Sequence, residues 1–159
     1  ELIELYAVRE ALEGMACRLA AVAMSTADVA RVRALLDAHE RRPDVQADTG
    51  YFQEEGPPDF HFQVVAGSGN AELIALVEQL SHRVRLYRYR SSHVRRRPQR
   101  ALKEHHQILD AIEAGDASAA DSRMRGRIFN RAAACRIRCL SGRPLEHDPV
   151  LLCPVMSLH

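Results

Sequence analysis

The sequence predicts an all-α fold, an antiparallel bundle of six to seven helices. Apolar residues recur at spacings of three and four along most of the chain, as they do on one face of a helix. No stretch of useful length alternates apolar and polar residues in the way of a half-buried strand. The apolar share is 47% and aromatic residues make up only 5%, a mixture dominated by Ala, Leu and Val that helices tolerate better than sheets.

The first two helices are predicted from an apolar stripe and a capping motif. From residue 5 to residue 22, apolar side chains alternate spacings of three and four, which predicts one buried stripe on a helix of about six turns. The stripe consists of Leu5, Val8, Leu12, Met15, Leu19 and Val22. Ser25 and Asp28 form a capping box, with Ser25 as the N-cap, so a second helix follows and ends near Arg41-Arg42-Pro43.

Polar residues and glycines divide the middle of the chain. Residues 43–56 are expected to be mostly loop. Pro57-Pro58 favours a short helix that runs to about Ala66, because proline is accepted in a first turn. Gly67 to Asn70 is a break, and Asn70 can cap a fourth helix that continues toward Tyr89.

Two further helices complete the predicted bundle. A loop over residues 91–97, bracketed by Pro98, precedes a fifth helix whose stripe is Leu102, His105, Leu109 and Ile112. Gly115 ends it, and Asp116 caps a sixth helix from Ala117 to about Cys139. We therefore expect a helical domain over residues 1–140 and an irregular tail over residues 141–159.

Composition and charge exclude several classes of protein. A net charge of +1 gives no global field that would attract nucleic acid. No run of about 18 apolar residues predicts a membrane span, and no leader is visible, so we expect no membrane association and a cytoplasmic protein. Cys135 and Cys139 lie one helical turn apart and could form a ligand pair, but small buried apolar residues in a reducing compartment are the favoured interpretation of the four cysteines.

Three polar residues are predicted to point inward from otherwise apolar helices. They are His61, His105 and Arg127. Burying such groups costs free energy unless partners satisfy them. Three of them facing one core indicate a polar cavity in the bundle, as in a protein that senses a small molecule.

Three stretches of the chain resemble one known family. Tyr6–Glu13 is similar to an opening helix of the form Y-x-x-R-x-x-L-E, and Phe60-His61 followed by Ala66–Asn70 is similar to F-H…A-x-G-N. Glu104-His105 and the run that ends at Ala117 are similar to E-H-x-x-I-L-x-A-I-x-x-G-D-A. These motifs resemble the FCD domain, the C-terminal effector-binding part of FadR-type GntR transcription regulators, and the resemblance covers roughly residues 2–135.

The resemblance implies a helical bundle that forms a homodimer and binds a small organic acid as its effector. It also implies an upstream winged-helix domain, absent from this chain, through which alone operator DNA would be bound. Many members of the family hold a divalent metal with one Asp and three His. The Asp position is occupied here by Pro57 and the last His position by Arg127, so His61 and His105 match. Asp59 lies only two residues from His61 and on a regular helix points elsewhere.

The departure at Arg127 changes the expected ligand. Arginine stays protonated and donates only, so it cannot ligate a metal, and its planar fork suits a carboxylate. Alternatively, Arg127 points to solvent on a helix rich in arginine. Arg9 either reaches the pocket or pairs with Glu13 on the surface. His106 points away from His105 and is expected to be solvated.

Residues 83–100 contain eight arginines interleaved with tyrosines, which could indicate a nucleic-acid patch. At helical spacing these side chains spread around the helix, so a solvated face is favoured, with Arg88 or Tyr89 as contributors to the pocket.

We interpret the chain as the ligand-sensing and dimerisation domain of a transcription regulator, which binds a small anionic metabolite in the bundle core. The expected ligand-binding residues are Arg9, His61, His105, Arg127, Arg88 and Tyr89. No cofactor is expected; a divalent metal such as zinc, if present, would use His61, His105 and Asp59. An alternative is a metal-dependent or His-based enzyme, against which no nucleophile with a base and an orienting group is visible. A helical scaffold without a ligand is the third interpretation.

Overall fold

Six helices make up the part of the chain that the structure, a computed structural model, describes: residues 2–42, 60–90 and 98–140. They are α1 (Leu2–Ala23), α2 (Thr26–Glu40), α4 (Phe60–Gly67), α5 (Ala71–Arg90), α6 (Pro98–Glu113) and α7 (Ala117–Leu140). No strand occurs within these ranges. The predicted all-α fold is therefore confirmed.

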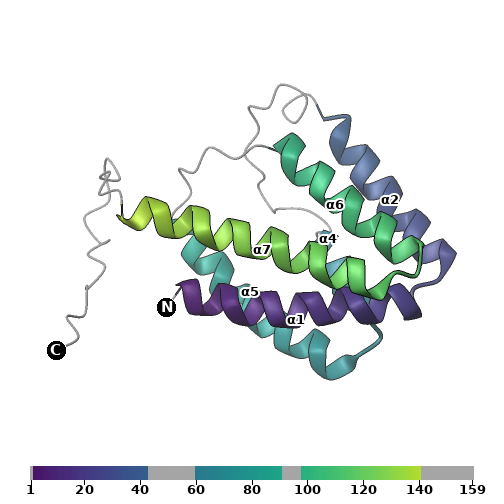
Figure 1. The fold of residues 1–159 in the computed structure, drawn as a ribbon, viewed down its shortest axis with the longest axis horizontal. Helices are drawn as coiled ribbons and strands as arrows, with labels where there is room; N and C mark the ends of the chain where they lie inside the picture. The colour runs from purple at the N-terminus through teal and green to yellow at the C-terminus, as the bar shows by residue number, and fades with distance from the viewer. Residues whose placement is uncertain (1, 43–59, 91–97, 141–159) are drawn as a thin grey trace.

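Helix α1 lies at the centre of the bundle, in contact with α4, α5, α6 and α7. It runs antiparallel to α7 along most of its length, and α2 packs beside α6 at the far end (Figure 1). This arrangement places one helix among four neighbours, so more than one side of α1 is shielded from solvent.

Local signals fixed the helix ends as the sequence predicted. The Ser25 hydroxyl accepts the Asp28 amide at 3.2 Å while the Asp28 carboxylate accepts the Ser25 amide at 3.2 Å, which completes the capping box. The carboxamide oxygen of Asn70 accepts an amide of α5 at 3.0 Å, and the Asp116 carboxylate accepts one of α7 at 2.9 Å. Gly115 has a φ of 70°, the left-handed conformation that ends a helix most easily with glycine.

The predicted breaks near residue 25, over residues 67–70 and at residue 115 are confirmed. Pro98, expected to mark the end of a loop, is the first residue of α6, a position at which its missing amide hydrogen costs no helical hydrogen bond. The breaks expected over 43–56 and 91–97, the helix start at Pro57-Pro58 and the tail over 141–159 lie outside the described residues.

The prediction for the buried face of α1 was wrong. Val8, Met15 and Val22 of the predicted stripe are 50%, 42% and 81% exposed. The buried face keeps Leu5 of the stripe and otherwise consists of residues outside it: Tyr6, Arg9, Glu13, Gly14, Ala16, Cys17 and Ala20. Leu12 and Leu19 of the stripe are only partly buried, and the charged residues Arg9 and Glu13 lie on the fully buried face.

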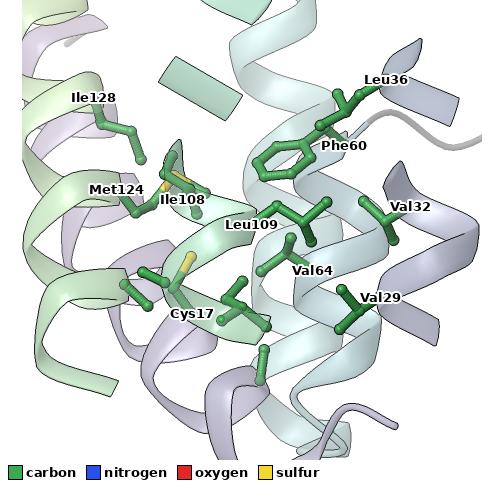
Figure 2. Close-up of a cluster of buried hydrophobic side chains, with 14 of the residues drawn as sticks. Cys17, Val29, Val32, Leu36, Phe60, Val64, Ile108, Leu109, Met124 and Ile128 are labelled. Atoms are coloured by element: carbon green, nitrogen blue, oxygen red, sulfur yellow. The ribbon is translucent and has the colours of Figure 1, made fainter. Parts of the chain in front are cut away.

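The main core lies where α1, α2, α4, α6 and α7 meet. Figure 2 shows Val29 and Val32 of α2 facing Leu109 of α6 and Val64 of α4, with Met124 of α7 on the other side. Leu109, Val64 and Met124 are fully buried. This apolar layer fixes the positions of α4, α6 and α7, from which the polar residues described next project.

Candidate functional site

Five polar side chains from four helices are buried together in the interior. They are Arg9 and Glu13 of α1, His61 of α4, His105 of α6 and Arg127 of α7, none more than 7% exposed. Their contacts form one continuous line across the bundle, which we call the buried polar line.

Glu13 connects the first three members of the line. One of its carboxylate oxygens accepts from the Arg9 guanidinium one turn earlier on the same helix. The other oxygen lies 2.5 Å from Nδ1 of His61. Both oxygens are therefore paired, which is how a fully buried carboxylate avoids an uncompensated desolvation penalty.

The second half of the line joins the two histidines to Arg127. Nε2 of His61 and Nε2 of His105 are 3.4 Å apart. The Nη2 atom of Arg127 lies 2.5 Å from Nε2 of His105. At the rim, a carboxylate oxygen of the half-buried Glu104 lies 4.0 Å from Nε of Arg127.

These contacts fix the tautomers of both imidazoles. His61 donates from Nδ1 to Glu13, because a carboxylate only accepts. Arg127 only donates, so Nε2 of His105 is the acceptor and Nδ1 of His105 carries the proton. That Nδ1 atom is buried and has no hydrogen-bond partner. His105 thus presents an unsatisfied donor inside the bundle.

Phe60 holds the histidine rings in place. Its ring stacks on His105, with centroids 4.3 Å apart and planes at 24°. The same ring meets His61 edge to face at 5.8 Å. The dipeptide Phe60-His61 therefore supplies one member of the line and the aromatic wall beside it.

Burial and neighbouring charge set the protonation states. Burial raises the pKa of Glu13, but the Arg9 charge and the contact with His61 outweigh it and hold that pKa far below its usual range. Burial lowers the pKa of His61, a shift that Glu13 only partly offsets. Burial, followed by the Arg127 charge, lowers the pKa of His105 well below its usual value. At neutral pH the line therefore contains one carboxylate, two guanidinium groups and two neutral imidazoles.

The buried residues do not fit the four-ligand metal centre that the family resemblance implied. Zinc takes at least three protein ligands, and the line offers two imidazoles, because both Glu13 oxygens are engaged. The Arg127 guanidinium also lies against Nε2 of His105, where it competes with a cation for that lone pair. Asp59 lies outside the described residues.

Sequence reasoning placed some site residues and missed another. The structure puts His61, His105 and Arg127 in one chain of contacts, so Arg127 does not point to solvent. The Arg9–Glu13 pair was foreseen only as a surface pair, whereas both residues are buried. Glu13 itself was not selected. Glu13 lies four residues after Arg9 on the same helix, next to small residues that are buried, and this spacing could have indicated a buried ion pair. Arg88 and Tyr89 lie in α5, and their side chains are outside the described part.

Two smaller predictions concern cysteines and membranes. Cys17 is a fully buried free thiol, as the favoured interpretation required, and burial together with nearby Glu13 raises its pKa. The side chains of Cys135 and Cys139, and all of Cys153, lie outside the described residues. None of the described helices is long and apolar enough to cross a membrane.

Comparisons with known proteins establish the family. The FCD domain family matches residues 4–129. Among solved structures, E. coli McbR/YncC superposes with a TM-score of 0.63 at 21% identity, over 86% of this chain and 64% of that chain, a likeness of fold. The present chain thus spans less than two thirds of the length of that structure. The comparison with curated proteins found no match for this chain. The match over most of its length shows that the chain belongs to the FCD domain family of GntR-type transcription regulators.

Proposed function

We propose that the buried polar line is the effector site of a ligand-sensing domain, and that its ligand is a small anionic metabolite, an organic acid. The observation that carries the proposal is the buried Nδ1 donor of His105, which has no partner. Leaving such a donor unsatisfied costs about 1–3 kcal/mol. A ligand that accepts a hydrogen bond there recovers this free energy.

The charge of the line favours an acceptor that is negative. Its buried members combine two guanidinium groups with one carboxylate, so their sum is positive when the histidines are neutral. A carboxylate matches the fork of Arg127, and a second acceptor on the same ligand would take the Nδ1 proton of His105 on the other edge of the ring. Each charge-assisted bond contributes about 1.5–3 kcal/mol. We propose His61, His105 and Arg127 as the ligand-binding residues, with Arg9 acting through Glu13.

The ligand would act on the arrangement of a homodimer. A ligand shifts a conformational equilibrium only by its difference in affinity for the two states. Binding between α4, α6 and α7 would favour one packing of these helices. In a cytoplasmic regulator with an upstream winged-helix domain, that packing would set the spacing of the paired DNA-reading helices. A regulator family points to a role other than catalysis.

Calorimetric titration with a panel of mono- and dicarboxylic acids tests the site. We expect one acid to bind the parent, and Arg127→Ala to weaken that binding by about 10- to 150-fold, the equivalent of one charge-assisted bond. Arg123→Ala is the matched control, because Arg123 is an exposed arginine one turn earlier on α7. It should bind like the parent.

Three results would count against the proposal. Equal affinity in Arg127→Ala and the parent would remove Arg127 from the site. A stoichiometric metal held through His61 and His105 would contradict a metal-free anion site. A monomer in sedimentation at micromolar concentration would contradict the homodimer.

A further inference from the structure

A second group of polar side chains lies on the other side of α6, outside the buried polar line. Asp37 and Glu40 of α2 and His106 of α6 each place one potential ligand atom within 4.8 Å of the others. All three line a groove of about 710 Å³ between the end of α2 and the start of α6. His106 was expected to be solvated, but it is half-buried in this groove.

We propose that Asp37, Glu40 and His106 form a binding site for a divalent transition-metal ion, with zinc as the best match. One imidazole nitrogen and two carboxylate oxygens are ligands that zinc accepts. Three protein ligands leave a fourth position for water, which the groove can supply. The site shares no residue with the buried polar line, although His106 directly follows His105 in α6.

Two observations beyond the clustering favour a ligand. Nε2 of His106 is a buried atom without a hydrogen-bond partner, so this ring nitrogen is left unsatisfied. Within the described part of the chain, Asp37 and Glu40 form no ion pair, although Arg41 and Lys103 line the same groove. Two carboxylates without an ion pair among the described residues, beside an unsatisfied imidazole nitrogen, are arranged for an external cation.

The geometry requires only a small adjustment. Bonds of about 2.0–2.3 Å in a tetrahedral zinc site separate ligand atoms by roughly 3.3–3.7 Å. The ligand atoms, which lie within 4.8 Å of one another, must therefore approach by at most about 1.5 Å. Glu40 is exposed at the end of α2 and can rotate without disturbing the core. A bound ion would join α2 to α6 beside the Arg33 contacts with Asp110 and Glu113.

Titration of the 159-residue chain with Zn²⁺ tests the site. We expect saturable binding with one ion at this groove, and a loss of at least ten-fold in affinity in His106→Asn. Asp37→Asn and Glu40→Gln should each weaken binding by a smaller factor. Lys103→Met should strengthen it, because a positive neighbour is removed. Substituting Co²⁺ should give the visible absorption of a four-coordinate site in the parent and not in His106→Asn.

His82 and Glu78 provide the control, since they are an exposed His–Glu pair one turn apart on α5. His82→Asn should bind zinc like the parent. An equal loss in His82→Asn and His106→Asn would mean scattered surface binding and would overturn the proposal. Unchanged binding in His106→Asn, or no saturable binding by the parent, would do the same.

A folding defect in His106→Asn would not leave the question open, because Asp37→Asn and Glu40→Gln change one half-buried and one exposed side chain without changing their size. Zinc should raise the thermal midpoint of the parent and raise it less in these two variants. Organic-acid binding in the presence of a chelator reports on the effector site alone. Failure of the metal-site proposal can thus be distinguished from failure of the effector-site proposal.

Discussion

The α1–α7 side of the bundle and the α2–α6 side use charged residues in opposite ways. On the first side, Arg9, Glu13 and Arg127 are buried in the interior. On the second side, the contact between α2 and α6 is apolar inside, and charges lie at its edge, where Arg33 reaches Asp110 at 2.9 Å and Glu113 at 2.6 Å. An arginine paired with a carboxylate therefore occurs both buried and solvent-exposed within one small domain.

This difference separates stability from function. An exposed ion pair contributes little, because water and salt screen it. A buried pair contributes little net stability either, yet breaking one partner leaves an uncompensated charge. The edge pair is therefore replaceable, whereas the buried polar line is sensitive at every member. The buried interior, where each charge depends on its partner, is therefore the better place for a site that responds to a small ligand.

The largest expected effect is the removal of one buried charge. Glu13→Leu should lower the free energy of unfolding by about 3–5 kcal/mol, because Arg9 loses its counter-charge and stays buried. The double variant Arg9→Met/Glu13→Leu should recover the part of that loss caused by Arg9, since an apolar pair replaces the ion pair, while Nδ1 of His61 still lacks its acceptor. Urea unfolding at pH 7 measures both. A double variant as unstable as Glu13→Leu would show that the Arg9–Glu13 pairing is not the cause.

The second effect is a dependence of stability on pH. Burial lowers the pKa of both His61 and His105 in the folded state, so the unfolded chain binds their protons first. Their contribution is complete above pH 6.5, the usual histidine value, and is lost as the pH falls below it. The loss should approach about 1.4 kcal/mol per histidine for each pH unit below that value.

Urea unfolding between pH 8 and pH 5 measures this slope. His105→Asn removes one of the two titrating groups and should reduce the slope over that range. The control is His82→Asn, because His82 is exposed on α5. Its slope should equal that of the parent. A parent whose stability is flat from pH 7 to pH 5 would contradict the neutral, buried state of the two imidazoles.

The smallest effect is expected at the α2–α6 edge. Arg33→Ala removes both ion pairs at once, yet it should change the free energy of unfolding by less than about 1 kcal/mol. The change should shrink further at high salt. A loss as large as that of Glu13→Leu would remove the contrast between the two sides of the bundle.

The sequence by itself determined the helices and most of their ends. Ser25, Asn70, Gly115 and Asp116 act within their own turn of chain, so their roles do not depend on the rest of the fold. It also determined that His105 faces inward, because Leu102, Leu109 and Ile112 share its stripe and are buried with it. The family motifs pointed to the same class of domain.

The tertiary structure alone decided which face of α1 is buried. Hydrophobic periodicity assumes that a helix has one buried side, but α1 has four neighbouring helices and buries a side that includes Arg9 and Glu13. Those charges can enter the core only because His61, 48 residues away from Glu13, brings a matching donor. No local pattern contains that partner. Pairing between distant segments is what makes a buried charge possible, and it exists only once the chain has folded.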